Sequence, residues 1–256
     1  MLGVARGAVA AFAAFAVVLL AGCGSSTGGR GLGGPVRPPV RLTVIGDSLA
    51  AGYYASTADH AFPQLVAREM RHAGEAVTTT VVSRAGATTA DAQRWKVGIT
   101  SDVVVVELGT NDWGDAVSID QFTTRYQDVL ARVRAASPKA RLLCMGEWAG
   151  ADEQNGIGIA SRQYDAAVQR ACSAARGTYV DIAAAYDDPA NHGPAGAPSF
   201  LGSSDWFHPN DAGHRALADD ILGRVLGRGR TQLSPDGDAD SPAGGDGARA
   251  VAGVSR

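Results

Sequence analysis

The chain lacks several features that mark large classes of proteins. It has no excess of positive charge, because 23 Lys and Arg stand against 26 Asp and Glu, for a formal net charge of -3. This balance gives no electrostatic reason to expect a nucleic acid or an anionic lipid surface as partner. The sequence also shows no internal repeat. Its 256 residues, 45% hydrophobic and 19% charged, are typical of one globular domain with a sizeable core.

The apolar run at residues 8–21 is too short to cross a membrane. It has 14 residues, whereas a spanning helix needs roughly 20. Because Arg6 precedes the run and small residues follow it, the pattern is typical of a signal peptide. The run ends in the letters LAGC, which resemble the lipobox of bacterial lipoproteins and imply that Cys23 is lipidated. The alternative is an ordinary secretory signal in which Cys23 is incidental. We therefore expect an exported protein, either lipid-anchored to the outer face of a bacterial cell membrane or secreted.

Large apolar residues are scarce at both ends of the chain. Residues 24–39 (GSSTGGRGLGGPVRPP) are rich in Gly and Pro, and residues 229–256 have the same character. Such segments bury too little apolar surface to fold. The sequence predicts a signal peptide at 1–22, the lipidated Cys with a flexible tether at 23–39, a folded domain at 40–228 and a disordered tail at 229–256.

Short β-branched apolar runs alternate with amphipathic segments in the folded domain. The near-continuous Val run at 103–106 suits a strand buried on both faces, as parallel sheets require. The alternation predicts an α/β protein, a three-layer α/β/α sandwich with a central five-stranded parallel sheet. In such sheets the ligand site lies beyond the carboxyl ends of the strands. The expected strands are 41–46, 76–83, 102–109, 140–146 and 178–183, and helical patterns lie near 61–74, 88–97, 118–136, 160–176 and 211–227.

Ser48 stands where the first predicted strand turns into a helical segment. This place exposes its hydroxyl group to a ligand. Two common motifs are missing around it. The second Gly falls four residues after Ser48, so the G-x-S-x-G elbow is absent. The segment also lacks the Lys and the Gly spacing of a phosphate-binding loop. Taken alone, Ser48 is either a nucleophile or a helix-capping residue.

Two further strand ends carry groups that can stabilise negative charge. After the second strand comes Gly86, whose backbone N–H can approach a substrate oxygen closely. After the third strand comes Asn111, whose neutral amide is a donor of the kind that stabilises an oxyanion. Each residue has an ordinary alternative role, a turn glycine for Gly86 and a cap or Asx turn for Asn111.

Asp205 and His208 form a D-x-x-H pair just before the last predicted helix. A nucleophilic serine needs a general base, and the imidazole needs a carboxylate on its other nitrogen. Residues three apart in a turn can be neighbours, so Asp205 can orient His208 locally. A D-x-x-H pair also suits a metal, but no further His or Cys stands near it with ligand-like spacing, and we expect no metal site. A surface loop with helix-capping Asn210 and Asp211 is the remaining alternative.

Together these motifs resemble, in their order and their places at strand ends, the four blocks of the SGNH (GDSL-like) hydrolase family. The blocks are GDSL at 46–49, Gly86, GTND at 109–112 and D-x-x-H at 205–208, and the resemblance covers about residues 41–225. It implies the flavodoxin-like fold of that family, with Ser48 as nucleophile and His208 as base oriented by Asp205. It also implies an oxyanion hole made by the N–H groups of Ser48 and Gly86 and the side chain of Asn111.

The resemblance implies an exported serine esterase that hydrolyses carboxylic esters through an acyl-enzyme, without a metal or organic cofactor. One alternative is acyl transfer, or deacylation of a carbohydrate or lipid, at the same residues. Another is a non-catalytic envelope-binding lipoprotein that keeps only the fold. The expected partners are a small-molecule, lipid or sugar ester and, through the anchor, the membrane. We expect a monomer that binds no nucleic acid.

Aromatic residues follow several strand ends and are expected to wall the substrate pocket. Tyr53, Trp148 and Trp206 are the candidates for substrate binding, with Tyr186 and Phe200 nearby. Aromatic rings can hold an acyl chain or stack on a sugar ring, and their alternative role is core packing.

Two cysteines lie on consecutive predicted elements, Cys144 on a strand and Cys172 on the helix that follows. Consecutive elements usually pack together, and disulfides persist in exported proteins. A bridge between them is therefore expected, and two buried free thiols are the alternative.

Overall fold

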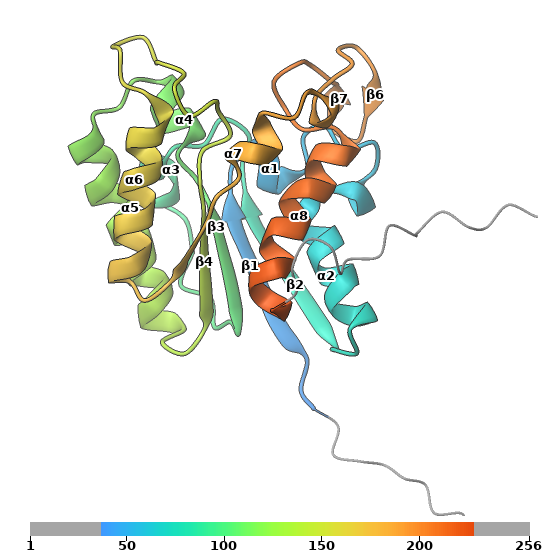
Figure 1. Cartoon of the computed structure of the whole chain (residues 1–256). Coiled ribbons are helices and arrows are strands. Elements are labelled where there is room, and N and C mark those ends of the chain that lie inside the picture. Colours follow the sequence, from blue (N-terminus) through green and yellow to red (C-terminus); the bar gives the residue numbers. More distant parts are fainter. Residues whose placement is uncertain (1–36, 228–256) are drawn as a thin grey trace, which may run out of the picture. The chain divides into compact units, whose positions relative to one another are not determined.

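The computed structural model describes residues 37–227, and a parallel sheet runs through its centre (Figure 1). All neighbouring strand pairs in this sheet are parallel, in the order β2-β1-β3-β4-β5. The predicted α/β fold with five parallel strands is confirmed. The last strand is three residues shorter than predicted, because the chain turns into a short helix soon after Val180. The strands are β1 (Val40–Gly46), β2 (Val77–Ser83), β3 (Val103–Glu107), β4 (Arg141–Met145) and β5 (Thr178–Val180).

Helices cover both faces of the sheet. One face packs against α2 (Phe62–His72) and α8 (Asp211–Leu226), and the other against α5 (Ile119–Ala136) and α6 (Ser161–Ala174). The valines of β3 are all buried and alternate between the two cores. Val103 and Val105 pack with α2 and α8, while Val104 and Val106 pack with α5 and α6. Their all-apolar run is what a strand covered on both sides requires.

Short elements follow the carboxyl ends of the strands. The helix predicted near 88–97 shrinks to four residues, because the hydrogen bonds beyond it, from Trp95 N to Ala92 O and from Val97 N to Trp95 O, close tight turns. This helix is α3 (Thr89–Ala92), and the helical segment expected at Ser48 is α1 (Ser48–Ala51). The remaining short elements were not expected. They are α4 (Thr110–Gly114), α7 (Ala183–Tyr186), the 3₁₀ turns η1 (Ala58–His60) and η2 (Pro189–Asn191), and the antiparallel hairpin of β6 (Pro198–Ser199) and β7 (Gly202–Ser203).

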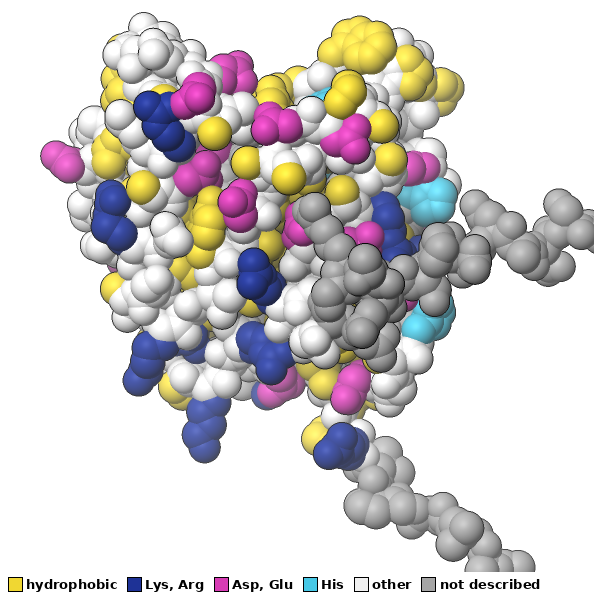
Figure 2. Space-filling view, viewed as in Figure 1, with side chains coloured by type: hydrophobic (Ala, Val, Ile, Leu, Met, Phe, Trp, Pro, Cys, Tyr) yellow, Lys and Arg dark blue, Asp and Glu magenta, His cyan; other side chains and the backbone are white. Residues whose placement is uncertain are grey.

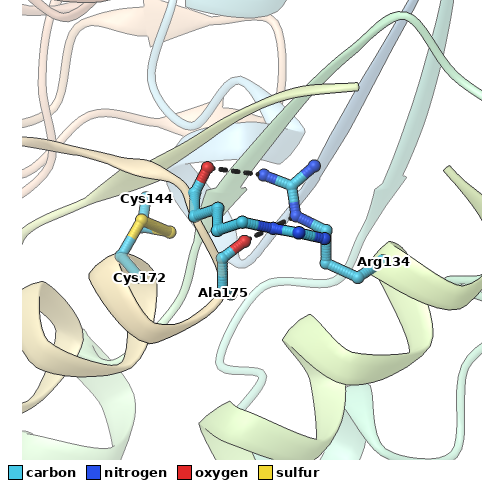
Figure 3. Close-up of a disulfide and its surroundings, with 5 residues drawn as sticks. Arg134, Cys144, Cys172 and Ala175 are labelled. Carbon is cyan, nitrogen blue, oxygen red and sulfur yellow. Dashed lines mark hydrogen bonds between the residues drawn. A yellow bond between two sulfur atoms is a disulfide. The ribbon is translucent and has the colours of Figure 1, made fainter. Parts of the chain in front are cut away.

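A disulfide joins Cys144 of β4 to Cys172 of α6, with the two Cα atoms 6.1 Å apart (Figure 3). The expected bridge is thus present in the structure. Arg134 of α5 lies beside it, and its guanidinium donates to the carbonyl oxygens of Ala140, Ala175 and Arg176 at 2.7, 2.6 and 2.8 Å. These contacts fasten the end of α6 to α5 and to the start of β4.

Several predicted segments lie outside the described residues. They are the signal peptide at 1–22, Cys23, most of the tether at 23–39 and the tail at 229–256. Within residues 37–227, no helix is long and apolar enough to span a membrane.

Candidate active site

Ser48 begins α1 directly after β1, at the carboxyl edge of the sheet. The preceding residue, Asp47, caps this helix, because its Oδ1 accepts a hydrogen bond from Leu49 N at 3.1 Å. The short turn from strand to helix holds the Ser48 side chain at the edge of the core, 5% exposed. The predicted candidate nucleophile therefore stands where ligands of parallel sheets bind.

The structure brings His208 and Asp205 to Ser48 across 160 residues of sequence. His208 Nε2 lies 3.0 Å from Ser48 Oγ, and His208 Nδ1 lies 2.9 Å from Asp205 Oδ2. Asp205 Oδ1 also accepts hydrogen bonds from the backbone N–H groups of Phe207 and His208, at 2.9 and 2.7 Å. With Nδ1 donating to Asp205, Nε2 is left as the acceptor that faces the hydroxyl group.

The Asp205 carboxylate is suited to hold the imidazole. Its partial burial by itself would raise its pKa, but the hydrogen bonds from His208 and from the Phe207 N–H outweigh burial and lower the pKa below its ordinary value. Asp205 therefore stays ionised at neutral pH, as a residue that stabilises an adjacent imidazolium must.

Two backbone N–H groups are free to bind a developing oxyanion. Among residues 37–227, no acceptor takes the N–H of Ser48 or of Gly86. Gly86 has φ +71°, in the left-handed region that favours glycine, and a Cβ placed there would touch nothing within 4 Å. Glycine is thus required at this position by the backbone conformation and not by crowding.

Asn111 lies close to Ser48, but both hydrogens of its amide are engaged. Nδ2 donates to Asp47 Oδ2 at 2.7 Å and to Ala87 O at 3.1 Å. To donate to an oxyanion, the amide must give up one of these partners, and the longer bond to Ala87 O is the weaker. The third expected oxyanion donor is present at the site and would act by exchanging partners.

The fully buried Trp148 and the half-buried His192 fasten the turn that carries Asp205 and His208. Trp148 Nε1 donates to Phe207 O at 2.7 Å, and His192 Nδ1 lies 3.0 Å from the same oxygen. The expectation that Trp148 binds substrate is wrong, because this side chain is fully buried. Its ring packs in the core against Tyr186 and His192. Trp148 supports the turn from below and does not line a pocket.

Aromatic rings surround the exposed side of His208. The rings of Tyr53, Tyr54 and Phe207 lie 5.8, 5.0 and 5.2 Å from its imidazole. Trp206 is 68% exposed, and only glycine fits at position 193 beneath it, because a Cβ there would lie 2.3 Å from the indole. Tyr53 and Trp206 thus remain candidates for substrate contact.

The surface beside the site is apolar and raised. Phe200, between β6 and β7, is 47% exposed, and its N–H donates to Ala55 O at 2.8 Å, so the hairpin is fixed to the loop that follows α1. Figure 2 shows hydrophobic side chains gathered on the lobe over β6 and β7, and the surface dips between this lobe and the one over α4. A separate hollow, lined by Arg37, Arg41 and Asp102 among others, lies at the opposite edge of the sheet and does not belong to this site.

Three contributors to the site were not found from the sequence. Asp47 contacts both Ser48 and Asn111, and Glu107 accepts a hydrogen bond from the backbone N–H of Asp47. The available sequence signal for Glu107 was a charged residue at the end of a run of valines. His192 gave no signal, because nothing in its neighbourhood shows that it contacts Phe207. Of residues 37–227, no group of three or more His, Cys, Asp or Glu side chains is arranged to hold a metal ion.

A family model described as GDSL-like Lipase/Acylhydrolase family matches residues 44–216 of the chain. The matched range runs from β1 into α8 and contains Ser48, Gly86, Asn111, Asp205 and His208. No curated protein matches the chain.

Several solved structures share the fold at low sequence identity. A phospholipase A1 from Streptomyces albidoflavus NA297 is 18% identical, with a TM-score of 0.54 over 73% of this chain and 99% of that one. The psychrotrophic esterase EstA from Pseudoalteromonas sp. is 15% identical, with a TM-score of 0.57 over 73% and 99%. An acetyl-xylooligosaccharide esterase from Geobacillus Stearmophilus is 18% identical, with a TM-score of 0.58 over 74% and 95%.

Proposed function

Since the chain belongs to the GDSL-like lipase/acylhydrolase family and is a carboxylic ester hydrolase, we propose that it acts through an acyl-enzyme on Ser48, with His208 as general base and Asp205 as the carboxylate that orients it. The observation that carries this proposal is the unbroken line of contacts from Ser48 Oγ to His208 Nε2, at 3.0 Å, and from His208 Nδ1 to Asp205 Oδ2, at 2.9 Å.

The reaction follows from these contacts in two steps. Ser48 Oγ attacks the ester carbonyl carbon while its proton passes to His208 Nε2, and the oxyanion that forms is held by the N–H groups of Ser48 and Gly86. Asn111 adds its amide by leaving Ala87 O. Collapse of the intermediate expels the alkoxide, which takes the proton from His208. Water then attacks the acyl-enzyme by the same route and restores the Ser48 hydroxyl group.

Replacing the nucleophile tests the mechanism. Ser48→Ala should lower kcat/KM on p-nitrophenyl acetate by about a thousandfold or more, since the triad acts as a unit. The chain offers a matched control in Ser56, which also contacts a histidine and a carboxylate. There, however, Ser56 Oγ and Asp211 Oδ2 both lie against His60 Nδ1, at 2.7 and 2.8 Å. This arrangement cannot relay a proton from one ring nitrogen to the other, so Ser56→Ala should keep wild-type turnover. A folded Ser48→Ala variant with near wild-type kcat would overturn the mechanism.

We propose that Tyr53 and Trp206 contact the substrate. The support is the Tyr53 ring 5.8 Å from the His208 ring, and the 68% exposure of Trp206 two residues before His208. Trp206→Ala should raise KM for esters with a large acyl or sugar part and leave p-nitrophenyl acetate almost unaffected. Equal kinetics on all of these esters would show that the indole does not touch substrate.

We also propose that the protein is exported and anchored by a lipidated Cys23, and that it works as a monomer. The support for the anchor is the sequence pattern at 8–23, since Cys23 lies outside the described residues. Cys23→Ala should move the protein from the membrane fraction to the soluble fraction with its esterase activity intact. Membrane retention of this variant, with normal processing, would contradict the anchor.

Sedimentation of the purified domain tests the separate proposal that the protein works as a monomer.

A further inference from the structure

Asp47 is a fully buried carboxylate that touches both halves of the candidate site. Its Oδ2 accepts from Asn111 Nδ2 at 2.7 Å, and its Oδ1 accepts from Leu49 N at 3.1 Å and lies 3.3 Å from Ser48 Oγ. Ser48 follows β1 and Asn111 follows β3. One side chain thus links the ends of two neighbouring strands at the point where the reaction is proposed to occur.

Glu107, the last residue of β3, holds Asp47 from behind. It is 1% exposed, and its Oε2 accepts hydrogen bonds from Asp47 N at 3.1 Å and from Ala50 N at 3.2 Å. The two buried carboxyl groups influence each other's pKa, and the charge of Asp47 disfavours ionisation of Glu107.

Burial raises the pKa of both carboxyl groups. Burial, reinforced by the charge of Asp47, raises the pKa of Glu107 well above its usual value. Burial raises the pKa of Asp47 only to about 6, because hydrogen bonds from Leu49 N and Ser48 Oγ, the neighbouring Glu107 and the charge of His208 oppose it. Asp47 is therefore an ionised acceptor at pH 7. The other titratable groups that act on the pair are His208, Glu147 and Tyr126.

An ionised acceptor at this place decides how Asn111 can move. The charge-assisted bond to Asp47 is the stronger of the two that the amide makes. It keeps the amide plane in place while the second hydrogen changes from Ala87 O to an oxyanion. Building on the acyl-enzyme mechanism proposed above, we propose that Asp47, supported by Glu107, is a positioning residue that holds Ser48 and the Asn111 amide in catalytic register.

Isosteric variants test this role. In Asp47→Asn, a single carbonyl oxygen cannot accept from both Leu49 N and Asn111 Nδ2, and the new NH₂ group faces one of these donors. Loss of one hydrogen bond to a charged group corresponds to a fall in kcat of roughly 10- to 100-fold. KM for p-nitrophenyl acetate should change less than threefold, because the amide is aimed at charge that exists only in the transition state.

The two variants of Glu107 separate a specific contact from simple packing. Glu107→Gln keeps an acceptor for Asp47 N and Ala50 N, so kcat should stay within about threefold of wild type. Glu107→Leu removes this acceptor and should lower kcat as Asp47→Asn does. Asp165→Asn is a matched control: this half-buried carboxylate accepts from Glu147 N at 2.8 Å and from Tyr179 OH at 2.9 Å, but not from a site residue. It should leave kcat unchanged.

The results separate a failure of the positioning role of Asp47 from a failure of the proposed acyl-enzyme mechanism. If Ser48→Ala stays active, the proposed mechanism fails. If Ser48→Ala is inactive while folded Asp47→Asn keeps kcat within twofold of wild type, only the positioning role fails. The role also fails if Asp47→Asn raises KM and leaves kcat intact, or if Glu107→Gln loses as much kcat as Glu107→Leu. Should Glu107→Leu not fold, the Asp47→Asn and Glu107→Gln results decide the matter.

Discussion

The Asn111 amide lies at the candidate site with both of its hydrogens already donated to other groups. Its amide is fixed by a carboxylate on one side and by the Ala87 carbonyl on the other, at 2.7 and 3.1 Å. Only the second bond has to break when negative charge develops beside the amide. In the proposed mechanism, Asn111 therefore contributes little to the binding of an uncharged ester and stabilises mainly the charged intermediate.

Asn111→Ala should lower kcat by roughly a hundredfold to a thousandfold, the usual effect of removing one oxyanion donor. KM should change little, because the amide is engaged elsewhere until charge develops. Steady-state kinetics on a short p-nitrophenyl ester checks this split. Asn155→Ala is the control, since Asn155 Nδ2 donates to Trp113 O at 3.0 Å, away from Ser48. A loss confined to KM in Asn111→Ala would contradict an oxyanion role.

Residue types and their places were sufficient to single out Ser48, Gly86 and Asn111, because each follows a strand where parallel sheets place their ligands. Asp205 and His208 were singled out by their D-x-x-H spacing just before the last helix. The direction of a side chain cannot be obtained in this way. Trp148 follows a strand end too, yet it points into the core and supports Phe207 O.

At the scale of elements, the disulfide and Arg134 both fasten α6. Cys144 and Cys172 are fully buried, and Arg134 of α5 donates to three carbonyl oxygens around the end of α6. α6 is thus held covalently to β4 and by hydrogen bonds to α5. The reduced protein keeps only the second of these attachments.

Reduction of the bridge should lower the free energy of unfolding by about 3 to 4 kcal/mol, as the chain-entropy model gives for a loop of this length. Urea unfolding with and without a phosphine reductant measures the difference. The variant Cys144→Ala/Cys172→Ala is the control, and reductant should leave its unfolding midpoint unchanged. The same midpoint for wild type with and without reductant would mean that the two thiols are not bonded.

Periodicity predicted the long elements well and the short ones poorly. β1 to β4 begin and end within two residues of their expected bounds, because a buried strand shows its whole length as apolar letters. α4 and α7 have five and four residues, too few to display a helical period. The hairpin of β6 and β7 has only two residues in each strand, and nothing in its letters alternates.

At the scale of the whole molecule, the carboxyl edge of the sheet collects buried acids. Glu147 follows β4 and is 2% exposed, and a Cβ at Gly109 would lie 2.1 Å from its Oε1. Burial, reinforced by the charges of Asp165, Asp112 and Asp47, raises the pKa of Glu147 well above its usual value of 4.5. Glu147 therefore keeps its proton in the folded protein at pH values where the unfolded chain has released it.

This difference makes the stability of the domain depend on pH. Between pH 4.5 and the higher pKa of Glu147 in the folded state, folding takes up a proton, so raising the pH lowers the free energy of unfolding by about 1.4 kcal/mol per pH unit for one such group. Glu147→Gln cannot ionise and should lose less stability between pH 5 and pH 8 than wild type does. Urea unfolding at the two values measures the change. An equal loss in both proteins would show that Glu147 does not keep the proton.

The direction of the chain at its two described ends has a practical consequence. β1 begins at Val40 on the edge of the sheet opposite Ser48, and α8 runs back to the same edge, where Arg141 at the start of β4 donates to the Val225 carbonyl (Figure 1). Both described ends of the domain therefore lie on the side away from the candidate site. A tag, a fusion partner or an immobilising support joined at either end would meet the base of the domain, and the mouth of the site would stay open to bulky polymers or aggregated esters.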